Sequence, residues 1–92
     1  MRDFRGRTRS EMNAPRLVTL YSKPGCHLCE ELRALLDDLQ PIYDLTVEEI
    51  DIIRDKALYT RYRYDIPVVL FNGTEIARGR VDPARLAQSF CL

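Results

Sequence analysis

The chain has 92 residues, of which 46% are apolar and 30% are charged, and this balance is typical of a globular domain. It excludes a disordered chain, a collagen-like fibre and a coiled-coil rod. Because 14 basic and 14 acidic side chains cancel, the overall charge predicts no broad attraction to nucleic acid or to an anionic membrane. No apolar run approaches the ~20 residues that a membrane span needs. We therefore expect neither nucleic acid nor a membrane as a partner.

Residues 1–15 differ in composition from the rest of the chain. Their arginines are Arg2, Arg5, Arg7 and Arg9. They contain no apolar stretch that could form the core of a signal peptide, and the segment is short for an organelle transit peptide. We expect a disordered, arginine-rich tail over residues 1–15, followed by one folded domain over residues 16–92.

Residues 17–22 (LVTLYS) are apolar, β-branched and aromatic, and residues 23–25 (KPG) follow them. This pattern predicts a buried strand that ends in a turn. Over residues 26–39, leucines recur at spacings of three and four, which predicts an amphipathic helix whose acidic side chains face outward. We expect Pro41 to help to end this helix.

A second strand is predicted over residues 43–52, where apolar and polar side chains alternate as far as Val47. The phase of the alternation changes around Glu48 and Glu49, which predicts a bulge or a strand boundary there. A short helix is predicted over residues 54–62.

Two further strands are predicted over residues 68–71 and 75–77, with Asn72-Gly73 between them. Asn-Gly between apolar runs is the strongest short hairpin signal, because both turn residues must tolerate a positive φ. We therefore expect these two strands to pair in an antiparallel hairpin.

The last helix is predicted to begin with Asp82 as its N-cap and Pro83 at its first position, and Leu86 and Phe90 give it an apolar side. The expected order is thus β-α-β-α-β-β-α. A right-handed strand–helix–strand crossover makes the first two strands parallel, and the hairpin adds two antiparallel strands. The predicted fold is of the α/β class, a four-stranded mixed sheet with three helices.

The chemistry of the chain lies at Cys26 and Cys29, three residues apart at the start of the first helix. A Cα separation of about 5–6 Å is expected for such a pair and suits a disulfide. At a helix N-terminus, unpaired N–H groups and the helix dipole favour an anion. A thiol pKa lowered from ~8.5 to ~6 raises the thiolate fraction at pH 7 from ~3% to ~90%. We expect Cys26 to attack, Cys29 to resolve, and Lys23 and His27 to lower the pKa of Cys26.

Other interpretations of the cysteines stay open at this point. Such a pair can form half of a zinc site, which His27 and Cys91 could nominally complete. Because His27 is adjacent to Cys26, both would have to bend around one ion, and we expect no metal. The three cysteines are too few for a disulfide-scaffolded secreted domain, so we expect a reducing compartment, the cytoplasm, and treat Cys91 as a bystander.

Three motifs together resemble those of glutaredoxins over residues 17–90. The motifs are Ser22-Lys23-Pro24-Gly25-Cys26-x-x-Cys29 after a strand, Ile66-Pro67 before a strand, and Gly79-x-x-Asp82 before the last helix. The resemblance implies a thioredoxin-like fold. It also implies that Pro67 is a cis proline beside the cysteine pair, and that the backbone of Ile66 pairs with a substrate chain.

The same resemblance implies a set of residues that bind substrate or glutathione. The set is Ile66, Pro67, Arg78, Gly79, Arg80 and Asp82. Lys23 joins it if its side chain contacts a carboxylate, and the alternative for Lys23 is a solvated turn lysine. Glutaredoxins typically place two glycines before x-x-Asp, and here Arg78 stands where the first would be. The bulk of Arg78 could obstruct glutathione, Arg78 or Arg80 could bind a carboxylate through a bidentate pair, or both could lie in a solvated loop.

The expected function is that of a thiol–disulfide oxidoreductase that reduces protein disulfides or glutathione mixed disulfides through Cys26 and Cys29. It would be a monomer with no bound cofactor, reset by glutathione or by a reductase as external reductant. The alternative is a module that binds a metal or an iron–sulfur cluster through the same cysteines. The absence of a tryptophan before Cys26 makes the chain less like a thioredoxin proper.

Overall fold

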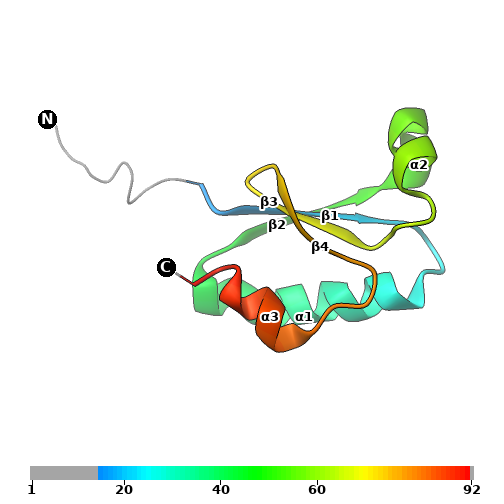
Figure 1. Ribbon diagram of the computed structural model, residues 1–92. Helices are drawn as coiled ribbons and strands as arrows, with labels where there is room; N and C mark the ends of the chain where they lie inside the picture. The colour runs from blue at the N-terminus through cyan, green and yellow to red at the C-terminus, as the bar shows by residue number, and fades with distance from the viewer. Residues whose placement is uncertain (1–14, 92) are drawn as a thin grey trace, which may run out of the picture.

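The computed structural model describes residues 15–91 and contains a four-stranded sheet flanked by three α-helices (Figure 1). The elements are β1 (Leu17–Ser22), α1 (His27–Tyr43), β2 (Thr46–Asp51), the 3-10 helix η1 (Ile52–Arg54), α2 (Lys56–Tyr62), β3 (Val68–Phe71), β4 (Thr74–Arg78) and α3 (Pro83–Gln88). The strand order is β2-β1-β3-β4, in which β1 and β2 are parallel and the other neighbours antiparallel. The predicted element order and mixed sheet are confirmed. The proposed tail lies outside the described residues, apart from Pro15.

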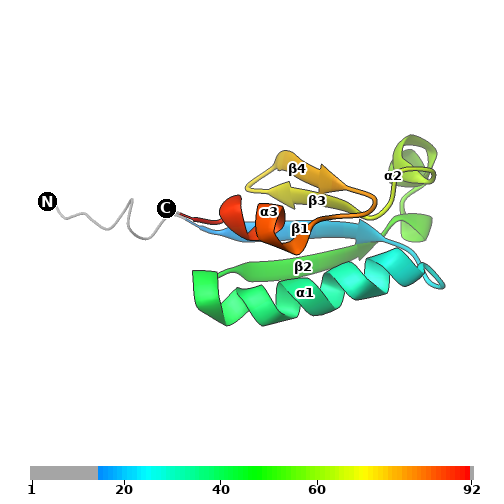
Figure 2. The same cartoon turned by 60° about the horizontal axis from the view of Figure 1, so that its bottom comes forward.

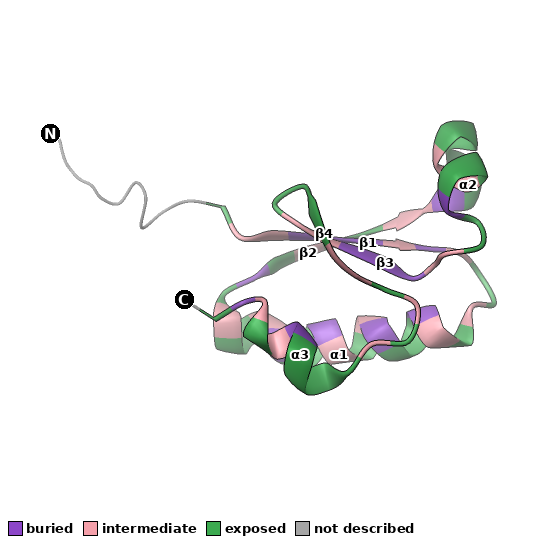
Figure 3. Cartoon of the chain, viewed as in Figure 1, coloured by how far each residue is buried: buried purple, intermediate pink, exposed green. Residues whose placement is uncertain are grey.

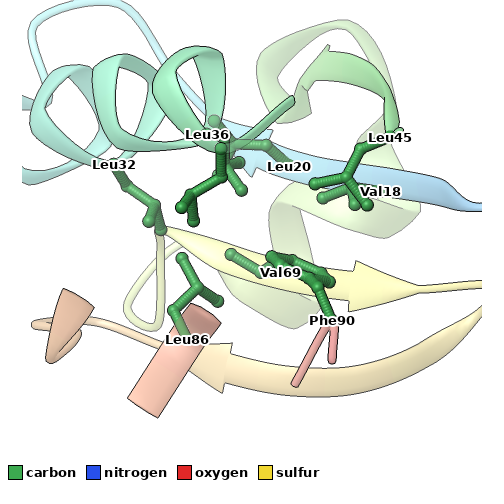
Figure 4. Packing of buried hydrophobic residues seen from close by; sticks show 9 residues of the cluster. Val18, Leu20, Leu32, Leu36, Leu45, Val69, Leu86 and Phe90 are labelled. Atoms are coloured by element: carbon green, nitrogen blue, oxygen red, sulfur yellow. The ribbon is translucent and has the colours of Figure 1, made fainter. Parts of the chain in front are cut away.

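Helices α1 and α3 cover one face of the sheet, and α2 lies on the other face at one end (Figures 1 and 2). The main core fills the space under α1 and α3, where leucines of α1 meet alternate residues of β1 and β3 (Figure 4). Its buried members are Val18, Leu20, Leu32, Leu36, Leu39, Leu45, Val69, Leu86 and Phe90. Beneath α2, a smaller cluster of Ile52, Tyr62 and Val68 is buried, while most of the outer surface of α2 is exposed (Figure 3).

Helix α1 is longer than predicted, because Pro41 lies inside its last turn and the helix continues to Tyr43. A proline costs most in a helix interior, where it removes a hydrogen bond. Here Pro41 is exposed, and the helix ends two residues later at Tyr43, after which Asp44 adopts a left-handed conformation with φ 57°. The N–H groups of Asp44 and Leu45 then both donate to the Gln40 carbonyl, so the end of the helix is capped without Gly.

Strand β2 is shorter than predicted, and the predicted irregularity at Glu48 and Glu49 is wrong, since the β1–β2 register runs without a break. Because β2 is an edge strand, both carboxylates can reach water while they accept from β1. Ser22 Oγ donates to Glu49 Oε2 at 2.6 Å, and Thr19 Oγ1 donates to Glu48 Oε1 at 3.4 Å. The sheet instead shifts register between β3 and β4, at Val69–Leu70.

The helix predicted over 54–62 is divided into η1 and α2, because two aspartates act as separate N-caps. The carboxylate of Asp51 accepts from the Ile53 N–H, and that of Asp55 accepts from the N–H groups of Ala57 and Leu58. The predicted hairpin is confirmed, with Asn72 at φ 49° and Gly73 at φ 87° in its turn. Within residues 15–91, no helix is long and apolar enough to span a bilayer.

Candidate functional site

Cys26 and Cys29 form a disulfide at the start of α1, and their Cα atoms lie 5.2 Å apart, within the predicted range. The turn that leads from β1 into α1 sets this position. The Cys26 N–H donates to the Lys23 carbonyl at 3.4 Å, and Gly25 takes φ 79°, where side chains other than that of glycine are strained. Four residues therefore connect the end of β1 to the start of α1, and Cys26 is the last of them, directly before the helix.

Cys26 is the N-cap of α1, so its sulfur occupies the position of the oxygen in an ordinary capping residue. The Cys29 N–H donates to Cys26 Sγ at 3.1 Å, and Cys26 is partly exposed whereas Cys29 is 2% exposed. Once the disulfide is reduced, this N–H and the helix dipole favour a negative charge on Cys26. Burial of Cys29 disfavours a thiolate there, because a charged group is poorly solvated in the protein interior. The two sulfurs are thus chemically unequal.

Lys23 and His27, predicted to lower the pKa of Cys26, differ in how the structure places them. Lys23 is partly buried in the turn before the disulfide. His27 is 82% exposed, and its Nε2 lies 2.9 Å from Glu31 Oε2 on the next turn of α1. The carboxylate of Glu31 therefore counters much of the charge that a protonated His27 would bring to Cys26. An effect of His27 on the thiol stays a prediction.

The segment that contains Ile66 and Pro67 enters the sheet beside the disulfide. Tyr21 of β1 pairs with Val68 of β3, so β3 begins where β1 ends and the turn to Cys26 starts. The Ile66–Pro67 peptide bond is cis, Pro67 is buried, and β3 begins only at Val68. Among the described residues no strand pairs with Ile66, which leaves its backbone free beside the cysteines.

Gly79 and Arg80 lie next to the cis-proline segment and near Leu28 of the cysteine motif. The Gly79 N–H donates to the Pro67 carbonyl at 2.7 Å, which ties the end of β4 to the cis-proline segment. Gly79 and Arg80 also line a hollow of about 180 Å³ against Leu28, the residue before Cys29. Pockets that enclose small ligands measure ~300–1,000 Å³, so this hollow fits a side chain or part of a ligand.

Arg78 is held by two carboxylates of its own chain. Its guanidinium donates to Glu75 through Nε at 2.6 Å and Nη2 at 2.7 Å, and Nη1 lies 3.3 Å from Asp65. The bidentate pair is therefore formed within the protein, between two residues of β4, and the separate ion pair with Asp65 joins β4 to the residue before Ile66. Neither Asp65 nor Glu75 was among the predicted site residues, because their alignment with Arg78 depends on the β3–β4 pairing.

This ion pair predicts a pH-dependent term in stability. The hydrogen bonds from Arg78 hold the pKa of Glu75 below its ordinary value of 4.5. Because the folded pKa is depressed, the stabilisation is present above pH ~4.5 and is lost as the pH falls through the folded pKa. In urea unfolding we expect the wild type to be more stable than Glu75→Gln at pH 7, and the difference to close toward pH 3. A difference that stayed constant with pH would contradict this.

The remaining predicted residues lie further along the chain. Asp82 is the N-cap of α3, and its carboxylate accepts from the Ala84 N–H at 3.0 Å, which confirms the predicted cap. Cys91 is exposed, and its hydrogen bond with Tyr43 raises the pKa of the Tyr43 phenol. Tyr43 ends the 17-residue helix that Cys26 begins, and at 1.5 Å per residue this separates them by ~25 Å.

Few metal-ligating side chains lie around Cys26 and Cys29 among the described residues. Within residues 15–91, no three His, Cys, Asp or Glu side chains come together in a group that could hold an ion. His27, nominally a fourth zinc ligand, faces Glu31, and Cys91 lies at the far end of α1. The structure joins Cys26 to Cys29 by the disulfide, and it joins Gly79 to Pro67 by a backbone hydrogen bond.

The chain is similar to known proteins along most of its length. The family model described as "Glutaredoxin-like domain (DUF836)" matches residues 17–90. A protein of Dictyostelium discoideum named "Glutaredoxin-like protein YDR286C homolog" is 27% identical over 75 residues, which cover 75% of this chain and 69% of that protein.

Several solved structures share the fold. Protein Ne2328 of Nitrosomonas europaea is 29% identical with a TM-score of 0.72, over 84% of this chain and 93% of that one. Protein XcR50 of X. campestris is 27% identical with a TM-score of 0.66, over 78% and 92%. A thioredoxin of Halobacterium salinarum, 22% identical with a TM-score of 0.61 over 80% and 70%, has the same fold. The thioredoxin-like fold implied by the sequence resemblance is confirmed.

Proposed function

The chain belongs to the glutaredoxin-like domain family, and on that premise we propose that it is a thiol–disulfide oxidoreductase whose redox pair is Cys26 and Cys29. The observation that carries the proposal is the placement of Cys26 as the N-cap of α1, with Cys29 buried one turn further. A partly exposed sulfur that accepts an N–H at a helix start is suited to be the attacking thiolate, and the buried sulfur to be the resolving one.

The reaction transfers two electrons from the dithiol to the substrate. The Cys26 thiolate attacks one sulfur of a substrate disulfide, a Cys26–substrate mixed disulfide forms, and the other substrate sulfur leaves as a thiolate that takes up a proton. Cys29 loses its proton and attacks Cys26 Sγ, which releases the second substrate sulfur and closes the Cys26–Cys29 disulfide. The disulfide seen in the structure is the oxidised product of this half-reaction.

An external dithiol or two equivalents of a monothiol must then return the two electrons. Glutathione or a reductase would serve. The N–H donors of Arg78 are occupied by Glu75 and Asp65, so Arg78 is not free to hold a carboxylate of glutathione if glutathione is the reductant. Arg80 has no such partner among the described residues and lines the hollow beside Leu28, so we assign it the contact with a substrate carboxylate.

A substrate chain would lie beside the cis-proline segment. The backbone of Ile66 is free to pair with an extended polypeptide, and β3 continues the sheet from Val68. A strand added here would present its sulfur toward Cys26, since β1 and β3 meet at this end of the sheet. The proposed substrate is therefore a disulfide or a glutathione mixed disulfide of a protein.

The proposed function is tested by measuring the reduction of a small disulfide, with glutathione and glutathione reductase in one assay and thioredoxin reductase in another. Catalysis in either assay, lost in Cys26→Ser, is the expected result. Metal and iron analysis of the purified protein accompanies it. A brown or zinc-bearing protein that catalyses neither reaction would support the metal or cluster-binding alternative instead.

The reduction potential gives an independent check. A protonated His27 next to Cys26 would add to the stabilisation that the helix start gives the thiolate of the reduced form, and stabilising the reduced form makes a disulfide more oxidising. We expect a potential less negative than the ~−270 mV of a thioredoxin. A redox titration against glutathione buffers measures the potential, and a value at or below about −270 mV would contradict the added stabilisation of the Cys26 thiolate by His27.

A further inference from the structure

The exposed side of α2 and the residues that follow it form an aromatic and basic surface next to the site. This α2 surface consists of the exposed Arg61, Arg63 and Tyr64 and of Tyr59, whose partly buried side chain also packs against the cluster under α2. Tyr64 is 85% exposed, the most exposed large apolar side chain among the described residues. A side chain this exposed contributes nothing to the core. Tyrosine and arginine are enriched where proteins bind one another, so this surface has the composition of a binding site.

The guanidinium groups on the α2 surface are held against aromatic rings. The Arg63 guanidinium carbon lies 4.7 Å from the centre of the Tyr64 ring and 5.7 Å from that of Tyr59, and that of Arg61 lies 5.1 Å from the Tyr62 ring. Stacking leaves the N–H donors at the rim of the guanidinium free. Within residues 15–91 no carboxylate lies in ion-pair distance of Arg61 or Arg63. Both are thus preorganised to receive a carboxylate.

Charge is unevenly distributed around the disulfide. Residues 53–64 carry four basic side chains and one acidic one, and the neighbouring carboxylates of Asp65 and Glu75 are paired with Arg78, whereas the first turns of α1 carry Glu30 and Glu31. Both elements border the same end of the sheet, because α2 leads into Ile66-Pro67 and α1 begins at Cys26 (Figures 1 and 2). An acidic polypeptide at the site is attracted by the α2 side and repelled by the α1 side, which fixes its orientation.

We propose that the α2 surface docks an acidic segment of the substrate protein, so that the preferred substrate is a disulfide flanked by aspartate or glutamate. This inference rests on the proposed function and adds the substrate class to it. Tyr64 and Asp65 directly precede Ile66 in the sequence, so a substrate segment that pairs with the Ile66 backbone lies close to the α2 surface. Carboxylates on the substrate then meet Arg61 and Arg63 in charge-assisted hydrogen bonds, with apolar contact to Tyr64.

The test uses two peptides, each with a central cysteine as a mixed disulfide with 2-mercaptoethanol, flanked by aspartates in one and by lysines in the other. With dithiothreitol as reductant, kcat/KM is measured by chromatography and divided by the uncatalysed rate of the same peptide. We expect the aspartate peptide to be preferred about tenfold, and the preference to shrink in 0.5 M salt, since screening weakens exposed charges.

Variants assign the preference to the surface. Arg63→Gln is expected to lower kcat/KM for the aspartate peptide about fivefold and the Arg61→Gln/Arg63→Gln double variant about tenfold, with no loss for the lysine peptide. The matched control is Arg85→Gln, an exposed arginine on α3, which should leave both peptides within twofold.

The outcomes separate this inference from the proposed function. If the chain reduces both peptides equally and the double variant changes nothing, the docking of an acidic segment is wrong and the oxidoreductase stands. If it reduces neither peptide nor hydroxyethyl disulfide, the proposed function itself fails. Binding of a labelled single-stranded oligouridylate that the double variant abolishes, without a peptide preference, would assign the surface to nucleic acid and overturn the inference.

Discussion

Replacing Cys26 by serine is expected to lower the rate of disulfide reduction by at least ~1,000-fold. A serine hydroxyl keeps its proton at neutral pH, so the N-cap of α1 would still accept the Cys29 N–H but would no longer hold a nucleophile. Steady-state turnover of hydroxyethyl disulfide with glutathione and glutathione reductase measures the loss. Cys91→Ser is the matched control, because Cys91 lies at the other end of α1 and should leave the rate unchanged.

Cys29→Ser should behave differently from Cys26→Ser. Without the buried sulfur, the mixed disulfide on Cys26 has no internal partner to release it, and it accumulates unless an external thiol removes it. A stable Cys26–substrate adduct with a protein substrate, together with residual activity where glutathione can resolve it, is therefore expected. Equal activities for the two variants would contradict the unequal roles of the cysteines.

Replacing Phe90 by alanine is expected to lower the free energy of unfolding by ~3–5 kcal/mol. Phe90 is fully buried, packs edge-on against Phe71 at 5.1 Å between ring centres, and has Tyr43 at 6.1 Å. Its ring joins the segment after α3 to β3 and to the end of α1, and it lies near Val69 of β3 in Figure 4. Because α3 is only six residues long, its docking depends on this side chain and on Leu86.

The comparison for Phe90→Ala is Ile42→Ala, whose side chain is 68% exposed on α1. Removing an exposed side chain changes the free energy of unfolding by no more than ~0.5 kcal/mol. Urea unfolding followed by circular dichroism gives both values. A loss at Phe90 as small as that at Ile42 would show that α3 does not contribute to the core.

Much of the fold could be predicted because local signals and burial agree. The leucine spacing in α1 matches the side that the core covers, and Asn72-Gly73 takes the positive φ values that its turn requires. Asp82 is both a preferred N-cap and followed by proline, and α3 begins there. The position of Cys26 at a helix start was predictable for the same reason, since the strand, turn and helix signals adjoin.

The rest depended on tertiary structure that the sequence pattern does not contain. Pro41 is tolerated because the helix has only two residues left to run, and Glu48 and Glu49 fit a regular strand because that strand is at the edge. The pairing of Arg78 with Asp65 and Glu75 follows from the hairpin and from the segment before Ile66. The stacking of Arg63 between two tyrosines likewise requires the end of α2.

The central claim, an acidic thiol at Cys26 that precedes a buried partner, is tested most directly by the pH dependence of alkylation. The reduced protein is treated briefly with iodoacetamide at a series of pH values, and peptide mass spectrometry locates the modified cysteine. We expect Cys26 to react first, with a midpoint well below the ~8.5 of an ordinary thiol, while Cys29 stays unmodified. Reaction first at Cys29, or a midpoint for Cys26 at or above about 8.5, would contradict the account.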